Sequence, residues 1–141
     1  MSEQATEQIN VQLIKDCYAA FQRGDIQTIL NNLTEDVQWV APNVEVVAGT
    51  YRGRDGVAKF FEKVAEISDF LSFEPREYVA QRDRVITLGS YHATAKSTGR
   101  SYQSDWAMSF TLRDGKVSRF QEYTDTAAIQ AALPSVSSAT A

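Results

Sequence analysis

Few side chains in this sequence are suited to chemistry, and Glu122 is the strongest candidate among them. It lies in segment 116–124, where alternation places Phe120, Glu122 and Thr124 on one face of an expected strand. A carboxylate among apolar side chains is poorly solvated, which raises its pKa and suits it to exchanging protons near neutral pH. The alternative is a structural Glu hydrogen-bonded to Tyr or Trp, because an unpaired ionised acid is costly in an apolar site.

Three further residues have side chains that could take part in a reaction. His92, the only histidine, is a second candidate acid or base if it faces the same site, and the pattern in 84–96 leaves open whether His92 or Tyr91 points inward. Cys17 lies on the apolar face of an expected helix without an identifiable histidine partner, so we interpret it as core or pocket lining. Asp125 precedes an alanine-rich segment and is interpreted as a helix cap.

Composition excludes several classes of function. One cysteine and one histidine leave no basis for an internal disulfide or a zinc site, so we expect no metal and no cofactor. The net charge is −4 and the basic residues are scattered, so we expect neither nucleic acid nor a membrane as a partner. The sequence has no signal-peptide pattern and no apolar run of membrane-spanning length, which predicts a cytoplasmic protein.

The rest of the chain must position these residues. A period of 3.6 predicts helices from Ile9 to Gly24, over 26–33 after a cap at Asp25, and over 57–67 after a cap at Asp55. A short strand, 37–40, and an irregular loop, 43–54, lie between the last two. Alternation then predicts strands over 71–79, 84–96, 102–113 and 116–124, followed by a short helix over 127–133. Asp114-Gly115 predicts a tight hairpin between the last two strands.

Helices followed by a run of strands predict an α+β fold. We expect a cone-shaped α+β barrel, in which a curved antiparallel sheet wraps around three N-terminal helices and leaves a concave cavity between them. We predict a single domain over 9–133, with a flexible N-terminus over 1–8 and a disordered tail over 134–141.

The order and spacing of several short motifs resemble the nuclear transport factor 2-like (NTF2-like) superfamily, in the branch of ketosteroid isomerases, SnoaL-like polyketide cyclases and limonene-epoxide hydrolases. The resemblance covers roughly residues 7–133 and implies the cone-shaped, cystatin-like fold and a homodimer through the outer face of the sheet. The motifs are Gly24-Asp25, Leu33-Thr34-Glu35-Asp36-Val37, Ala41-Pro42, Tyr51-Arg52-Gly53-Arg54-Asp55-Gly56, Thr98-Gly99-Arg100-Ser101-Tyr102, Asp114-Gly115-Lys116-Val117 and Glu122-Tyr123-Thr124-Asp125.

Two branches of the superfamily lack their reactive groups here. The resemblance places the base of a ketosteroid isomerase at Ala41, its oxyanion tyrosine at Cys17 and its second hydrogen-bond donor near Met108. None of these side chains can fill the role. The Arg and the first Asp of a limonene-epoxide hydrolase correspond to Gly89 and Tyr91, so epoxide hydrolysis ranks below the other functions considered.

The SnoaL-like cyclases match at one position. The resemblance implies that their acid corresponds to Glu122, whereas the histidine associated with it falls at Met108. We therefore predict a SnoaL-like or ketosteroid isomerase-like protein whose apolar cavity holds a small hydrophobic molecule, with cyclase- or isomerase-type acid/base chemistry through Glu122 as one hypothesis. The alternative is a binding or dimerising module without catalysis, and the chain's status as an enzyme is left open.

The predicted site has two candidate catalytic residues, Glu122 and His92. The predicted ligand-binding residues are Cys17, Tyr18, Trp39, Ala41, Tyr51, Phe60, Tyr91, Trp106, Met108, Phe110, Phe120 and Thr124. A third hypothesis makes the outer face of the sheet the working surface, most simply as a homodimer interface. It is based on Asp105, Ser109, Arg119 and Gln121, interspersed with Val117 and Tyr123.

Overall fold

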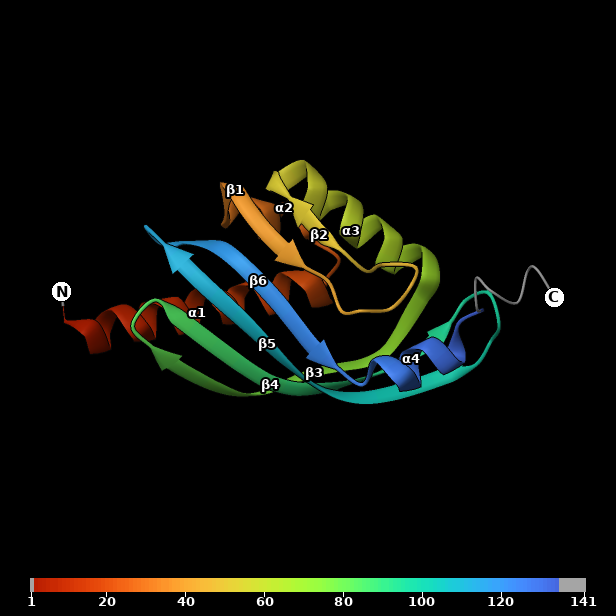
Figure 1. The fold of residues 1–141 in the computed structure, drawn as a ribbon. Coiled ribbons are helices and arrows are strands. Elements are labelled where there is room, and N and C mark those ends of the chain that lie inside the picture. Colours follow the sequence, from red (N-terminus) through yellow and green to blue (C-terminus); the bar gives the residue numbers. More distant parts are fainter. Residues whose placement is uncertain (1, 135–141) are drawn as a thin grey trace.

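A computed structural model describes residues 2–134 of the chain. It is a mixed α+β fold in which a curved, unclosed sheet carries helices on its concave side (Figure 1). The elements are α1 Glu3–Gln22, α2 Ile26–Asn31, β1 Leu33–Val40, β2 Thr50–Arg52, α3 Gly53–Ile67, β3 Ser68–Gln81, β4 Arg84–Ala95, β5 Ser101–Arg113, β6 Lys116–Thr124 and α4 Thr126–Ala132. The predicted fold class and the curved sheet are confirmed.

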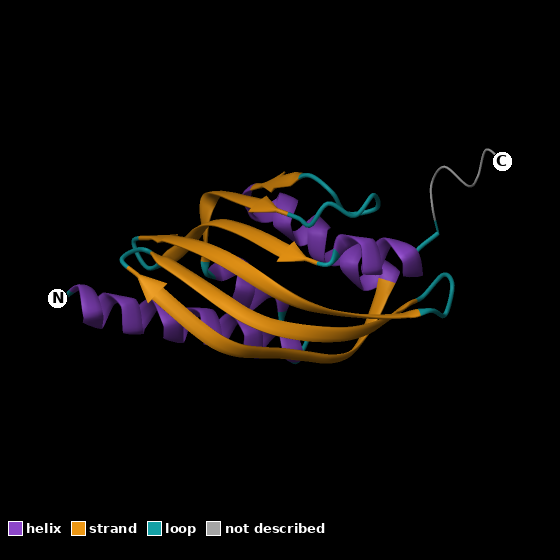
Figure 2. Cartoon of the chain, turned by 60° about the horizontal axis from the view of Figure 1, so that its bottom comes forward, coloured by secondary structure: helices purple, strands orange, loops and turns teal. Residues whose placement is uncertain are grey.

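The sheet has the strand order β2-β1-β6-β5-β4-β3. All neighbouring strands are antiparallel except β1 and β6, which pair in parallel, so the predicted wholly antiparallel sheet needs correction at this pair. Figure 2 shows the convex face in front, with the helices behind the strands. In the parallel pair Trp39 lies opposite Phe120, and their rings stack 3.8 Å apart at an interplanar angle of 17°.

Capping side chains determine where the shorter helices begin. The backbone N–H of Thr28 donates to Asp25 Oδ1 over 3.2 Å, and that of Ala128 donates to Asp125 Oδ1 over 3.0 Å. Both are the caps that the sequence indicates. Asp114 and Gly115 have φ angles of +52° and +76°, which two-residue turns between twisted antiparallel strands require.

Several boundaries differ from the sequence-based prediction; for example, β1 begins at Leu33 instead of residue 37, and β3 begins at Ser68 instead of residue 71. Helix α1 begins at Glu3 instead of Ile9, because Ser2 Oγ accepts a hydrogen bond from Ala5 N over 3.1 Å and caps it. Helix α3 begins at Gly53, so Asp55 lies in its first turn and is not its cap. Part of the predicted loop 43–54 forms β2, a short strand that pairs with β1. The predicted tail, apart from Pro134, lies outside the described residues.

None of the helices within residues 2–134 is long and apolar enough to cross a membrane. Nor does any group of three or more His, Cys, Asp or Glu side chains in that range come together as metal ligands.

Candidate functional site: an acid at the end of a parallel strand pair

A cavity of about 110 Å³ lies between the concave face of the sheet and the helices. Every helix and all strands except β2 contribute to its wall, and most of the lining is aromatic or aliphatic. The lining residues are Cys17, Tyr18, Phe21, Ile29, Trp39, Pro42, Val44, Val47, Phe60, Phe61, Val64, Ile67, Phe70, Phe73, Tyr91, Met108, Phe110, Phe120, Glu122 and Ile129. An enclosed apolar space with a few polar groups is the usual form of a small-molecule site.

Strand β6 places Glu122 in this cavity by simple alternation. Phe120 and Glu122 point inward, and the pairing of β5 with β6 sets Glu122 opposite Met108. The same alternation does not extend to the start of β6, because the register shifts between Thr111 and Leu112. Val117 is therefore buried, at 1% exposure, and its predicted position on the outer face is wrong.

Glu122 is held by a tyrosine from β4. The hydroxyl of Tyr91 lies 2.7 Å from Glu122 Oε2 and 2.8 Å from Thr124 Oγ1. Burial raises the pKa of Glu122 to about 7, and the hydrogen bond with Tyr91 opposes part of that rise. Within the described range 2–134, no Lys, Arg or His lines the cavity, so no cation there balances the charge of an ionised Glu122.

Two other polar groups on α1 are kept in their neutral forms. The hydroxyl of Tyr18 donates to Met108 Sδ over 3.2 Å, and burial raises the pKa of Tyr18 far above its usual range. Burial also raises the pKa of Cys17 to about 11, with a smaller contribution from the charge of Asp16. A thiol with that pKa is almost wholly protonated at neutral pH, which makes Cys17 a poor nucleophile.

Trp39 brings a hydrogen-bond donor to the cavity wall. It is 5% exposed, and its Nε1 has no hydrogen-bond partner among residues 2–134. Buried indole N–H groups usually have a partner, so an unpaired one on a cavity wall is available to an acceptor atom of a ligand.

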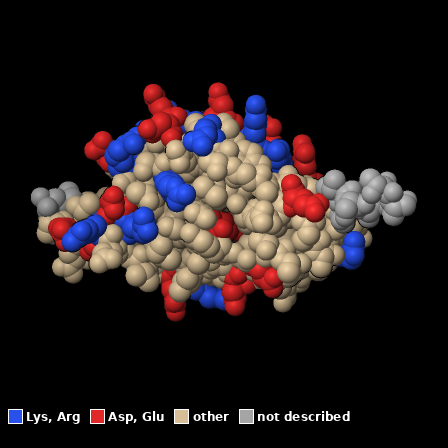
Figure 3. All heavy atoms as spheres, in the orientation of Figure 1, with Lys and Arg blue, Asp and Glu red and all other residues tan. Residues whose placement is uncertain are grey.

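Glu122 also lines a groove that opens to the outside. The pairing of β1 with β6 ends at Val40 and Gln121, so no strand covers the next residue of β6 on that side. The groove is lined by Val40, Ala41, Pro42, Asn43, Gly49, Thr50, Gln121, Glu122, Tyr123, Thr124 and Thr126. Among residues 2–134, Glu122 is the only acid that lines this groove, and acidic side chains are scattered over the face of the molecule in Figure 3. Glu122 and Pro42 line both groove and cavity, so they form the wall between them.

The structure brings most of the predicted site residues together. Glu122, Cys17, Tyr18, Trp39, Phe60, Tyr91, Met108, Phe110 and Phe120 all line the cavity. Ala41 and Thr124 line the outer groove instead. The alternation of β4 left open whether Tyr91 or His92 points inward, and in the structure Tyr91 lines the cavity.

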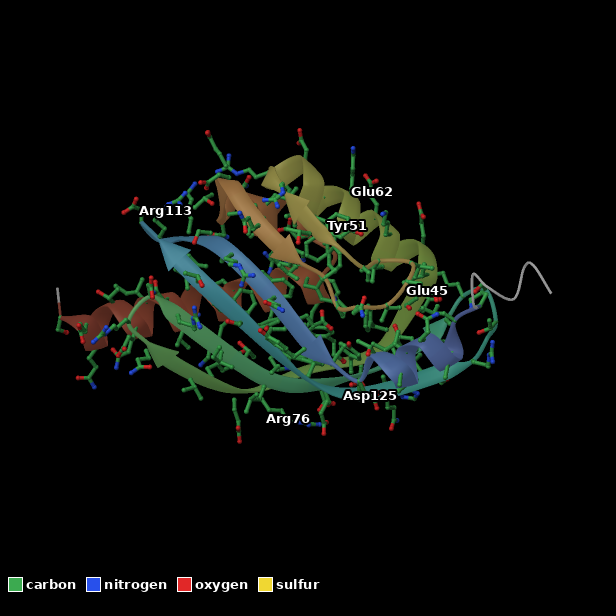
Figure 4. All side chains as sticks on the ribbon, in the orientation of Figure 1. Glu45, Tyr51, Glu62, Arg76, Arg113 and Asp125 are labelled. Atoms are coloured by element: carbon green, nitrogen blue, oxygen red, sulfur yellow. The ribbon has the colours of Figure 1, made fainter. Side chains whose placement is uncertain are left out.

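Three predicted site residues lie elsewhere. His92 follows Tyr91 in the strand, so its side chain is on the convex face and the structure does not place it with Glu122. Tyr51 packs against Phe60, and its hydroxyl donates to the carbonyl of Val47 over 2.8 Å (Figure 4). Trp106 is buried behind the cavity wall. It lies so close to Gly89 that a Cβ there would be 2.5 Å from its ring.

Several lining residues were not predicted. The stripe Phe61, Val64 and Ile67 was recognised as the apolar face of a helix, but its period does not tell core from cavity. The lining residues of β3, Phe70 and Phe73, lie on a strand with register shifts, where alternation is interrupted. Pro42, Val44 and Val47 come from an irregular segment without a period.

The helices on the concave side of a curved six-stranded sheet define an NTF2-like α+β domain with a mostly apolar internal cavity. The chain belongs to the SnoaL-like domain family, whose model matches residues 14–120. The predicted resemblance to the NTF2-like superfamily is confirmed.

Individual relatives share this fold along nearly their whole length. An NTF2-like protein from Burkholderia xenovorans LB400 is 39% identical, with a TM-score of 0.84 over 91% of this chain and 98% of that one. TerC, crystallised with polyporic acid, is 32% identical, with a TM-score of 0.79 over 88% and 97% of the two chains. The uncharacterized protein Rv0034 of Mycobacterium tuberculosis is 26% identical over 89% of this chain and 96% of its own length. A proposed polyketide cyclase from Silicibacter sp. TM1040, 19% identical, shares the fold alone.

Proposed function

We propose that this protein binds a small hydrophobic molecule in the cavity and moves a proton to or from it through Glu122. The observation that carries the proposal is a single carboxyl group in an otherwise apolar cavity, with a pKa raised by burial to about 7. Such a group is present in both protonation states near neutral pH, as a general acid or base requires. The match of the family model and the crystallisation of TerC with a small organic molecule support the same reading.

The geometry favours a ligand with an acceptor oxygen. Trp39 Nε1 offers an unpaired hydrogen-bond donor, and the stacked rings of Trp39 and Phe120 present a flat apolar surface beside Glu122. A ketone or enol on a compact ring system would use all of these features. We therefore choose 2-tetralone, a two-ring ketone with exchangeable hydrogens next to its carbonyl, as a probe.

Filling the cavity should prevent this binding. Val64 lines the cavity from α3, and its neighbour Ala65 is exposed on the same helix, so Val64→Phe and Ala65→Phe form a matched pair. We expect Val64→Phe to weaken the binding of 2-tetralone at least tenfold in isothermal titration calorimetry, because the added ring takes the space of the ligand. Ala65→Phe should bind as the wild type does. Equal affinity in all three proteins would place the ligand elsewhere and contradict the proposal.

A module that binds without catalysis is the second candidate function. It is favoured by the Tyr18–Met108 hydrogen bond, since a hydroxyl tied to a thioether and a methionine opposite Glu122 leave the acid without a second reactive group. The two functions differ in one result: only the first predicts that the bound ketone exchanges its hydrogens.

We further propose that two copies associate through the convex face of the sheet. Three large apolar side chains are exposed there: Val79 at 57%, Leu88 at 38% and Tyr123 at 55%. Arg76 and Asp105 border a depression containing Leu88 and Tyr123, and Figure 4 shows Arg76 pointing away from the helices. Charges of both signs beside an apolar patch can complement themselves under two-fold symmetry.

A charge in this patch should separate the two copies. Tyr123→Glu is expected to convert a dimer to a monomer in light scattering coupled to size-exclusion chromatography, because it would bury two like charges near the symmetry axis. Glu62→Gln, on the exposed side of α3, serves as the control and should leave the mass unchanged. A wild-type protein that runs as a monomer at high micromolar concentration would refute the dimer.

A further inference from the structure

A chain of hydroxyl groups leads from Glu122 to the end of the sheet. Glu122 Oε2 lies 2.7 Å from the Tyr91 hydroxyl, which lies 2.8 Å from Thr124 Oγ1. Thr124 Oγ1 in turn lies 2.8 Å from Ser104 Oγ. The three hydroxyls come from three neighbouring strands, β4, β6 and β5, so the register of the sheet keeps them in line.

The contacts of Ser104 at the far end of these hydroxyl groups favour one arrangement of hydrogens. Ser104 Oγ lies 2.6 Å from the carbonyl oxygen of Asp105, which can only accept a hydrogen bond. Ser104 Oγ also accepts a hydrogen bond from the backbone N–H of Asp125 over 2.9 Å, at the junction of β6 and α4 (Figure 4). The single hydroxyl hydrogen of Ser104 is therefore committed to the Asp105 carbonyl.

The position of the Ser104 hydrogen affects the hydrogen positions of the other hydroxyl groups, up to Glu122. When Ser104 uses its hydrogen in this way, Thr124 donates to Ser104 and Tyr91 donates to Thr124. An ionised Glu122 would need the same Tyr91 hydrogen, because Tyr91 is the donor in its contact with the carboxylate. Four contacts share three hydroxyl hydrogens, and the fourth hydrogen has to come from the carboxyl group itself.

The surroundings of Glu122 favour the same protonation state. The ionisable groups of the cavity wall are Cys17 and Tyr18 from α1 and Tyr91 from β4, all neutral at physiological pH, and the charge of Glu122 also acts on Tyr102 of β5. The lining residues from α2, α3, α4, β1 and β3 are apolar or aromatic. The outer groove adds no Lys, Arg, His or second acid.

We infer that Ser104, Thr124 and Tyr91 are positioning residues that hold a proton on Oε2 of Glu122 in the resting protein. This rests on the proposed function and specifies its starting state: the site begins as a neutral acid, so a ligand that carries a negative charge meets no repulsion from Glu122. When the Oε2–H bond breaks and the proton passes to the bound ligand, Tyr91, Thr124 and Ser104 can each turn their hydrogen toward the carboxylate of Glu122. Only the contact between Ser104 and the Asp105 carbonyl is then lost.

Removing the hydroxyl group of Ser104 should therefore change the pKa of Glu122. In Ser104→Ala, Thr124 is free to donate to Tyr91, and Tyr91 is free to donate to the carboxylate. Ionised Glu122 then costs no hydrogen bond, because the contact between Ser104 and the Asp105 carbonyl is already absent. We expect the pKa of Glu122 to fall by about one unit, the effect of one hydrogen bond. The measurement is the carboxyl ¹³C chemical shift of Glu122 between pH 4 and 9, assigned by its absence in Glu122→Gln.

Matched variants separate this effect from a general disturbance of the strands. Ser109→Ala removes a hydroxyl from the opposite face of β5 and should leave the titration of Glu122 unchanged. Thr124→Ser keeps a hydroxyl group at this position, so its Glu122 should titrate as in the wild type. Thr124→Ala should lower the pKa of Glu122, and this variant provides the test if Ser104→Ala does not fold.

An unchanged or raised pKa of Glu122 in the hydroxyl-deletion variants would overturn the inference. The titration needs no ligand, so that result would leave the proposed function standing. Conversely, the predicted fall in pKa would stand even if the protein proved to bind ligands without converting them.

Discussion

Glu122→Gln should slow proton exchange in the cavity strongly while leaving ligand binding nearly intact. The variant keeps the size and polarity of Glu122 beside Tyr91 but cannot take up or release a proton. General acid/base groups typically contribute a factor of 10² to 10⁴ to a rate, so we expect loss of at least about 100-fold. The assay follows the loss of deuterium from the position next to the carbonyl of 2-tetralone at pH 7.5 by NMR.

The two candidate functions give opposite results in this assay. If the wild-type protein exchanges deuterium no faster than buffer does while still binding 2-tetralone, proton transfer to this ketone is absent and the binding-only function is favoured. If Glu122→Gln exchanges as fast as the wild type, some other group carries the proton. Glu62→Gln, on the exposed side of α3, is the control for a change in net charge and should retain the wild-type rate.

Stability should fall as pH rises, and Glu122 should be the reason. The pKa of this carboxyl is 4.5 in its ordinary state and about 7 in the fold, so the folded chain binds the proton more tightly than the unfolded chain. The resulting stabilisation is fully present below about pH 4.5 and is lost as pH rises through about 7. A shift of this size, reduced for the partial exposure of Glu122, corresponds to about 2 kcal/mol.

Chemical denaturation of wild type and Glu122→Gln at pH 5 and pH 8.5 tests this expectation. The free energy of unfolding of the wild type should decrease by about 2 kcal/mol relative to Glu122→Gln between these two pH values. The comparison of the two proteins removes contributions from other carboxyls, such as Asp36, whose pKa is lowered by Arg113. Parallel pH dependence in both proteins would mean that Glu122 is solvated when folded.

The sequence predicted the elements better than the way they pair. Alternation and turn chemistry are local properties, so the hairpin at Asp114-Gly115 and the caps at Asp25 and Asp125 could be predicted from a few neighbouring residues. The parallel pairing of β1 with β6 joins segments about eighty residues apart, and no local pattern encodes it. The short strand β2 was missed because three residues do not establish a period.

The candidate site also could be predicted only in part, where local alternation was regular. Glu122 and its aromatic neighbours could be assigned to one face because β6 alternates regularly from Phe120 onward. His92 was included because the parity of β4 was left open, and only the structure shows that Tyr91 is the residue that faces the cavity. Ser104 escaped notice because its role depends on a chain of contacts across three strands, for which a single sequence gives no signal.

The parallel pair β1–β6 also bears on how the chain reaches its folded state. Trp39 belongs to the first strand and Phe120 to the last, so their stacking has to wait until almost the whole polypeptide is available. Contacts between such distant segments form late and slow folding, because a long loop must close before they contribute. During synthesis, β1 therefore leaves the ribosome with its edge unpaired, and the candidate acid takes its place only in the final step that also completes the sheet.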